Sequence, residues 1–299
     1  MSTGISVIIP VYNAEKYIKD CILSLSIQTF DDLECIFVID KNTTDNSEEI
    51  IKSVSNRLNL KIIKPTESCG AGYNRNVGIE RATKEYIGFV DADDCISKEF
   101  YEKLYSDAKK HDSDIVMGET VVLDKNHKVS DYYKIPTCTE TNLGKIYSMM
   151  EYSTVWDKIY RSKIVKPDKT VRFPEGVIHE DNFFTLAVLA KTNKLTTTPG
   201  AIYYWIRNPE SVTQLAQQSE KCIDDAYVVF DNVLNFLYKL DISTDDKLKI
   251  IKHNIDNYAI DAIFSLEYKS YIMEKLKLLL GKQAAYKIYY EAEQKFSDL

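Results

Sequence analysis

The strongest constraint in this sequence is an alternation of short apolar runs and helix-patterned segments over residues 1–123. The apolar runs 5–11, 33–39 and 60–63 predict strands, and each is followed by a segment whose apolar residues recur at helical spacing. A fourth run, 86–90, leads directly into Asp91. Apolar strands that alternate with helices predict an α/β fold with a mostly parallel sheet covered by helices on both faces.

The C-terminal part of the sequence has a different character. From residue 220 onward there is no proline and a single glycine, and helical spacing predicts helices near 220–239, 244–267 and 270–296. The last of these carries six lysines against three acidic residues between Lys269 and Lys295. Its apolar stripe either packs against the other helices or rests on anionic lipid, since basic amphipathic helices bind such surfaces.

Composition excludes several classes of protein. A formal net charge of −7 and a pI near 5.3 argue against broad nucleic-acid binding, which needs clustered lysine and arginine. The six cysteines are scattered without zinc-site spacing, so we expect reduced thiols. The N-terminus has neither the pattern of a secretory signal nor that of a spanning helix, and no later stretch is apolar enough to cross a bilayer. We therefore expect a cytoplasmic protein, and contact with the inner face of a membrane stays open.

Acidic residues follow the predicted strands. Asp40 comes after the second strand and Asp91 after the fourth, and ligands of such sheets bind where the carboxyl ends of the strands meet. Asp91, Asp93 and Asp94 are so close in sequence that their charges repel unless a cation neutralises them. Carboxylate oxygens suit Mg²⁺ or Mn²⁺, so we expect a divalent cation here. The alternative is that Asp93 or Asp94 caps the helix that starts near Lys98.

On these segments the sequence resembles the inverting glycosyltransferases of family 2, which have a nucleotide-binding GT-A fold. Several segments agree in the family's order and spacing. They are VIIPVYN at 7–13, Tyr17 with CILSLSIQTF at 21–30, the segment 40–47, GAGYNRNVG at 70–78, and the segment 86–94. We expect a GT-A domain over 1–218, with 1–123 binding the nucleotide sugar and 124–218 on the acceptor side. A C-terminal helical domain over 219–299 follows.

The resemblance implies roles for residues at the donor. Pro10, Tyr12 and Asp40 border the nucleotide base and ribose, and Arg75 lies near the base or the diphosphate. An alternative for Arg75 is a salt bridge to an acid on a helix face. Where the family usually has a second acid, this chain has Lys41. Lys41 either contacts a donor phosphate or points to solvent, so the identity of the base stays open.

The same resemblance assigns the D-x-D motif to Asp91, Ala92 and Asp93. It implies that Asp93 approaches a Mn²⁺ or Mg²⁺ ion bridging the two phosphates of the donor. Asp91 is the other carboxylate of this metal site and tends to face the ribose. A metal ion at this place would neutralise the charge that develops on the departing nucleoside diphosphate.

A second motif, 179–184, looks like the Glu-Asp pair that precedes a helix in the family. The resemblance implies that Asp181 is the catalytic base, which takes the proton of the acceptor hydroxyl as its oxygen attacks the anomeric carbon. Glu180 would position the acceptor or the base. The alternative is that Asp181 caps the helix. The segments 156–160 and 203–207 also resemble the acceptor side, although most of the aromatic rings at 203–205 fit a core strand.

These features predict an inverting glycosyltransferase of the EC 2.4 class. It would move a hexose or N-acetylhexosamine from a nucleotide-diphosphate sugar, with UDP preferred, to a hydroxyl of a growing surface glycan or glycolipid. The alternative is a catalytically inactive nucleotide-sugar-binding or scaffold protein with the same fold, for which Lys41 is the positive sign. No glycine-rich phosphate loop of a nucleotidyltransferase or G-x-G-x-x-G of an oxidoreductase follows the first strand. Homodimerisation through the C-terminal helices stays open.

Overall fold

The computed structural model describes residues 2–54, 58–135, 137–141, 153–208, 211 and 221–297. The chain divides into two compact units. The first unit comprises Met1–Thr141, Thr154–Gly176 and Lys191–Pro209, and the second comprises Asn142–Ser153, Val177–Ala190 and Glu210–Leu299. The predicted domain boundary between 218 and 219 lies outside the described residues.

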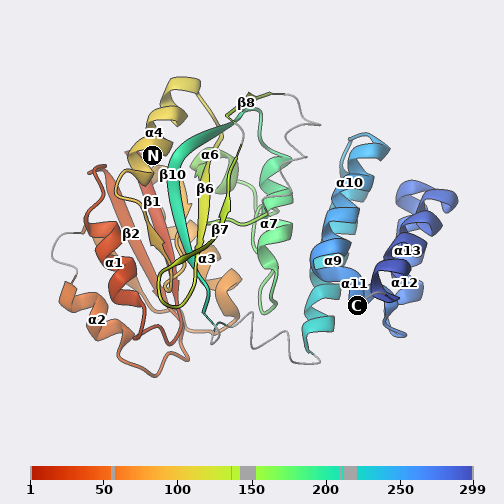
Figure 1. Cartoon of the computed structure of the whole chain (residues 1–299), viewed down its shortest axis with the longest axis horizontal. Helices are drawn as coiled ribbons and strands as arrows, with labels where there is room; N and C mark the ends of the chain where they lie inside the picture. The colour runs from red at the N-terminus through yellow and green to blue at the C-terminus, as the bar shows by residue number, and fades with distance from the viewer. Residues whose placement is uncertain are drawn as a thin grey trace. The chain divides into compact units, whose positions relative to one another are not determined.

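The first unit is built on a central sheet (Figure 1). The strands run in the order β3-β2-β1-β4-β9-β6-β10-β5, and β7 and β8 pair with β6 and β10 respectively. Their bounds are β1 (Ser2–Val11), β2 (Leu33–Ile39), β3 (Leu60–Ile63), β4 (Lys84–Phe89), β5 (Cys95–Ile96), β6 (Ile115–Leu123), β7 (Val129–Tyr133), β8 (Thr139–Glu140), β9 (Lys158–Arg161) and β10 (Leu195–Ile206).

The two halves of this sheet differ in strand direction. Strands β3, β2, β1 and β4 are all parallel, as their continuous apolar runs predict. In the other half, β6 and β10 are parallel to each other, whereas β9 lies antiparallel between β4 and β6. The predicted α/β fold is therefore confirmed, and the sequence pattern predicted the parallel half best.

Helices cover the sheet of the first unit. They are α1 (Ile18–Ser26), α2 (Ser47–Val54), α3 (Gly70–Arg81), α4 (Phe100–His111) and α6 (Ser162–Val165). Helix α3 packs on β1 and β2, and α4 packs on β6 and β10. Gly78 permits the close packing of α3, because a Cβ atom there would lie 2.3 Å from Cγ2 of Ile8 on β1.

The second unit is helical in its described residues (Figure 1). It contains α7 (Glu180–Leu189), α9 (Lys221–Lys239), α10 (Thr244–Asn254), a π-helical segment (Ile255–Ala259), α11 (Ile260–Phe264), α12 (Lys269–Leu280) and α13 (Lys282–Ser297). The prediction of one helix over 270–296 is wrong. Gly281 has a φ of 83° and separates α12 from α13, because this left-handed backbone ends a helix.

The apolar stripe predicted for that helix is shared between the two helices. Ile272 and Leu276 of α12 and Ile288 of α13 are buried, and α12 packs against α9, α10 and α13. The alternative that this stripe packs against other helices is confirmed for these residues. In the part of the chain that the structure describes, no helix combines the length and apolarity that a membrane span requires.

Candidate active site

The carboxyl ends of β1, β2 and β4 form the edge where the predicted donor residues gather. Val11 pairs with Ile39 at the ends of β1 and β2, and Ile8 pairs with Phe89 at the end of β4. Asp40 and Asp91 follow β2 and β4 closely at this edge. Strand β1 lies between β2 and β4, so the chain order reverses here, which is where parallel sheets bind ligands.

Asp40 is a buried carboxylate with a fixed orientation. Its Oδ1 accepts hydrogen bonds from the backbone N–H of Asn42 at 2.9 Å and from Oγ of Ser68 at 2.6 Å. Its Oδ2 accepts a hydrogen bond from Nδ2 of Asn74 at 3.2 Å. A carboxylate has about four acceptor positions, so Asp40 can still accept a hydrogen bond from a ligand.

Asn74 is a residue of this site that the sequence did not single out. It lies near the start of α3, is 2% exposed, and uses its amide nitrogen on Asp40. Its Oδ1 is buried and accepts no hydrogen bond from any described residue. A buried acceptor without a donor is costly, and a ligand N–H or O–H would offset that cost. Its position next to Arg75, inside the matching segment 70–78, was the signal available.

Arg75 connects α3 to the end of β4. Its Nη2 donates to Oδ1 of Asp91 at 2.7 Å, and its guanidinium lies 5.4 Å from the ring centroid of Phe173. The Arg75 side chain is 7% exposed, whereas that of Asp91 is 27% exposed. One partner of Arg75 is thus a predicted site residue, and this residue lies after a strand and not on a helix face.

The three neighbouring carboxylates at 91–94 have separate partners. Asp91 pairs with Arg75, and Oδ2 of Asp93 accepts a hydrogen bond from Asn208 at 3.2 Å. Asp94 is 2% exposed and accepts hydrogen bonds from the hydroxyl of Tyr203 and from the N–H of Ile206, both at 2.8 Å. Asp94 is therefore a structural residue that ties the end of β4 to β10.

Burial and mutual repulsion of the charges at 91–94 shift the pKa values of two of these carboxyl groups. Burial, reinforced by the charges of Asp93 and Asp91, raises the pKa of Asp94 well above its usual range. Burial and the charge of Asp91 also raise the pKa of Asp93. The capping alternative is wrong, since α4 begins after Glu99 and has no side-chain cap. Among the residues described, no group of three or more His, Cys, Asp or Glu side chains is placed to hold a metal ion.

The remaining predicted donor residues differ in exposure. Tyr12 is 50% exposed after β1, Pro10 is partly exposed, and Ala92 is 7% exposed. Lys41 is exposed next to Asp40. The ring of Tyr12 and the side chain of Lys41 are therefore accessible from solvent at this edge.

The predicted base lies in the second unit. Glu180 is almost buried and Asp181 partly exposed, and both belong to the first turn of α7. The N-cap of α7 is His179, not Asp181. Oδ1 of Asp181 accepts hydrogen bonds from the backbone N–H and the side-chain amide of Asn182, at 3.0 and 3.3 Å.

The aromatic segments of the first unit are mostly structural. Tyr203 is fully buried and stacks on Trp156, with ring centroids 4.2 Å apart and planes at 22°. Trp205 is 38% exposed and leaves part of its ring accessible. Arg207 is exposed at the end of this strand, and its N–H donates to the carbonyl of Leu123.

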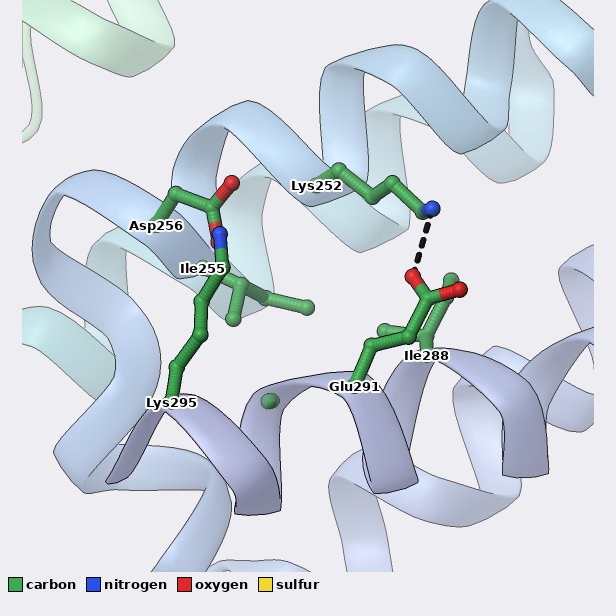
Figure 2. Close-up of a pocket in the computed structure, with 7 residues that line it drawn as sticks. Lys252, Ile255, Asp256, Ile288, Glu291 and Lys295 are labelled. Carbon is green, nitrogen blue, oxygen red and sulfur yellow. Dashed lines mark hydrogen bonds and ion pairs between the residues drawn. The ribbon is translucent and has the colours of Figure 1, made fainter. Parts of the chain in front are cut away.

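A separate cavity lies within the second unit and contains no predicted site residue. Its volume is about 110 Å³. Figure 2 shows charged side chains around it, and two ion pairs cross between helices there: Lys252 with Glu291 and Lys295 with Asp256, both at 2.6 Å.

Comparison with known proteins identifies the family. The family model described as "Glycosyl transferase family 2" matches residues 6–166, which is more than half of the chain. The chain belongs to glycosyl transferase family 2. The predicted family is confirmed, and so, at the level of the family, is the predicted enzyme class.

Several relatives are named glycosyltransferases. The poly(ribitol-phosphate) β-N-acetylglucosaminyltransferase TarS of Staphylococcus aureus is 33% identical over 208 residues, 69% of this chain and 36% of that protein. A poly(ribitol-phosphate) β-glucosyltransferase of Bacillus spizizenii is 29% identical, over 83% of this chain and 39% of that protein. The uncharacterized glycosyltransferase YibD of Escherichia coli is 30% identical, over 82% and 73%. The chain thus spans little more than a third of the first two proteins.

Solved structures agree with the fold. The crystal structure of S. aureus TarS 1–349 in complex with UDP-GlcNAc has a TM-score of 0.75 at 22% identity, covering 100% of this chain and 92% of that one. A mannosyltransferase from Pyrobaculum calidifontis, in complex with GDP-Man and Mn²⁺, has a TM-score of 0.55 at 14% identity, covering 99% and 87%. These likenesses confirm the predicted GT-A-type fold with C-terminal helices.

Proposed function

We propose that this protein is an inverting glycosyltransferase that moves a hexose or N-acetylhexosamine from a UDP-sugar to a hydroxyl of a surface glycan. The observation that carries the proposal is a pair of side-chain contacts at the switch point of the sheet. Asn74 donates a hydrogen bond to Asp40, and the next residue, Arg75, donates one to Asp91. The names of the relatives and the UDP-GlcNAc in the TarS structure support a UDP-sugar donor and a polyol-phosphate type of acceptor.

Asp40, Asn74, Pro10 and Tyr12 form the proposed base and ribose site. Uracil presents one imide N–H, and both Asp40 and Oδ1 of Asn74 offer a buried acceptor for it. The exposed ring of Tyr12 offers a surface on which the base can stack. Lys41 carries its positive charge beside this site, where it would favour the anionic donor.

Asp91 and Asp93 are the proposed ligands of a Mn²⁺ or Mg²⁺ ion. Mg²⁺ is commonly held by one or two carboxylates together with substrate phosphates, so two protein carboxylates fit this donor set. When bound, the metal would neutralise the charge of the leaving UDP. Arg75 orients Asp91 and adds positive charge next to the same site, and Asn208 holds Asp93 by one oxygen.

Asp181 is the proposed base. Its carboxylate would take the proton of the acceptor hydroxyl while the acceptor oxygen forms a bond to the anomeric carbon and the bond from that carbon to UDP breaks. Attack from the face opposite the leaving UDP inverts the configuration. Glu180, almost buried in the same turn, is proposed to hold the acceptor or the base in place. Contact of the protein with a membrane face and dimerisation stay predictions.

The first experiment combines binding and turnover. We would titrate the protein with UDP, GDP and their sugar conjugates by calorimetry, with and without Mn²⁺. We would then compare Asp181→Asn with the wild type in UDP release from UDP-GlcNAc, with poly(ribitol phosphate) as acceptor. Asp181→Asn is expected to lower kcat about 1,000-fold while metal-dependent UDP binding persists, because the base acts on the acceptor and not on the donor.

The control variant is Asp241→Asn, an exposed aspartate of the second unit, which is expected to leave both readouts unchanged. Unchanged turnover in Asp181→Asn would contradict the assignment of the base. If neither UDP nor GDP binds under any condition, the inactive scaffold protein becomes the better explanation, with Lys41 as the sign of a rebuilt donor site.

A further inference from the structure

The turn that presents Asp181 has an unusual backbone. His179, which precedes the Glu-Asp pair, has φ 64° and ψ 21°, the left-handed region that side chains other than glycine rarely adopt. Such a conformation is strained and persists when the surroundings enforce it. The position of Asp181 therefore depends on what holds His179.

Two contacts from the C-terminal helices hold this turn. The N–H of Ile178 donates to Oδ2 of Asp225 on α9 at 3.2 Å, and Asp225 is itself paired with Lys221 at 2.9 Å. The imidazole ring of His179 stacks on the ring of Tyr258, with centroids 5.3 Å apart and planes at 24°. Burial lowers the pKa of His179, although the charge of Asp225 opposes this, so the ring stacks in its neutral form near pH 7.

Tyr258 is fixed in turn by buried hydrogen bonds. Its hydroxyl donates to Oδ1 of Asn254 at 2.6 Å, and Nδ2 of Asn254 donates to the carbonyl of Ile250 at 2.7 Å. Tyr258 is 8% exposed and Asn254 is fully buried. Because both ring and hydroxyl of Tyr258 have partners, its ring is a rigid surface against which His179 rests.

Tyr258 belongs to the π-helical segment Ile255–Ala259, a rare geometry that often occurs at functional sites. The same segment contributes to the cavity of Figure 2, where Asp256 pairs with Lys295 of α13 and the neighbouring Lys252 pairs with Glu291. The pair of Asp256 and Lys295 connects the π segment to the last helix, and the pair of Lys252 and Glu291 connects α10 to it. The last helix, the π segment and the His179 turn are therefore linked by named contacts.

We infer that Tyr258 is a positioning residue for Asp181, acting through the ring of His179. The inference rests on the proposed function of Asp181 and gives the C-terminal helices a part in the reaction beyond covering apolar surface. Proximity supports the link: besides burial, the charge of Asp181 contributes to raising the pKa of Tyr258.

The test compares two changes at one position. Tyr258→Phe keeps the stacking ring and loses the hydroxyl, whereas Tyr258→Ala loses both. With UDP-GlcNAc and poly(ribitol phosphate), Tyr258→Ala is expected to lower kcat about 10- to 100-fold with KM for the donor unchanged, because a small displacement of the base is enough for such a loss. Tyr258→Phe should retain kcat within about threefold. Tyr238→Ala, a 66% exposed tyrosine of the same unit, is the matched control.

Amide hydrogen exchange gives a readout that does not need activity. In Tyr258→Ala, exchange of the amides at 178–182 should become about tenfold faster, and it should stay at the wild-type rate in Tyr258→Phe. If Tyr258→Ala does not fold, His179→Asn serves instead, since asparagine tolerates the left-handed backbone but lacks the stacking ring.

The outcomes separate the two proposals. Wild-type kcat together with wild-type exchange at 178–182 in Tyr258→Ala would overturn the positioning role. An equal loss of kcat in Tyr238→Ala would do the same, because the effect would then be non-specific. If the wild type itself transfers no sugar, the proposed function fails, and the exchange rates still decide whether Tyr258 holds the turn.

Discussion

Both edges of the parallel half-sheet carry buried carboxylates, but the pKa values of these carboxylates are shifted in opposite directions. At the amino edge, Glu34 of β2 is 2% exposed and accepts hydrogen bonds from Ser6, Lys61 and Thr83. Burial alone would raise its pKa, but these hydrogen bonds lower the pKa of Glu34 to about 2. At the carboxyl edge, burial raises the pKa of Asp93 instead.

The direction of the pKa shift indicates whether an ionised carboxylate stabilises the fold. A carboxylate with a lowered pKa stabilises the fold when ionised, whereas one with a raised pKa destabilises it until a ligand or cation arrives. At the amino edge, groups of the protein compensate the charge of Glu34, whereas at the carboxyl edge we propose that a bound cation compensates part of the charge. Variants at the two edges should therefore lose different properties.

Among variants at the two edges, the largest expected effect is the loss of activity in Asp93→Asn. We expect kcat/KM with UDP-GlcNAc and Mn²⁺ to fall about 100-fold or more, since a proposed metal ligand is removed. The unfolding temperature should stay the same or rise, because an ionised Asp93 is less favourable in the folded chain than in the unfolded one. Kinetics and thermal unfolding measure the two quantities.

Asp94→Asn is the matched comparison for Asp93→Asn. Its buried hydrogen bonds to Tyr203 and Ile206 predict a loss of stability, which Asp93→Asn should not show, and a smaller loss of Mn²⁺ affinity than in Asp93→Asn. Equal changes of stability and of Mn²⁺ affinity in both variants would show that the two carboxylates share one role. This result would contradict a structural role for Asp94 and a metal-binding role for Asp93.

Glu34→Gln should produce the converse result. We expect a loss of about 2 kcal/mol in the free energy of unfolding at pH 7, allowing for the half-exposed Lys61 partner, with UDP affinity unchanged. Because the folded pKa is the lower one, this stability is present above about pH 4.5 and lost as the pH falls toward 2. Urea unfolding at several pH values checks the magnitude and the sign.

Glu99→Gln is the control, because Glu99 forms an exposed pair with Lys103 that contributes little stability. A reduced UDP affinity in Glu34→Gln, with normal folding, would mean that the two edges are not separable.

The smallest expected effect is that of Gly78→Ala, a loss of about 1 to 2 kcal/mol in the free energy of unfolding. Gly78 lies on α3, which packs against β1. The added Cβ would meet Cγ2 of Ile8, and this clash should outweigh the gain in helix propensity. Because Asn74 and Arg75 lie on α3, UDP affinity should also fall several-fold. Calorimetry and thermal unfolding follow the two changes.

A second substitution tests the cause of the Gly78→Ala effect. Ile8→Ala removes the clashing atom, so the double variant should lose less than the sum of the single variants. Simple additivity of the two losses would point away from the contact between α3 and β1.

The order of helices and strands was predictable because it depends on local patterns. The segments 33–39 and 60–63 match β2 and β3 to the residue, since continuous apolar runs bounded by polar turns determine buried strands. The break at Gly281 was missed, because one glycine in a helical pattern marks an interruption and also occurs inside helices.

The sequence by itself determined the family and the residues that carry charge at the carboxyl edge, since order and spacing along the chain are enough for both. The tertiary structure alone decided how those charges are partnered. Asp91 forms an ion pair with Arg75, and Asp94 accepts a hydrogen bond from Tyr203. The turn before Asp181 packs through its histidine ring on Tyr258. Each of these partners is distant in sequence, and the packing of strands and helices that brings them together has no local signal in the sequence.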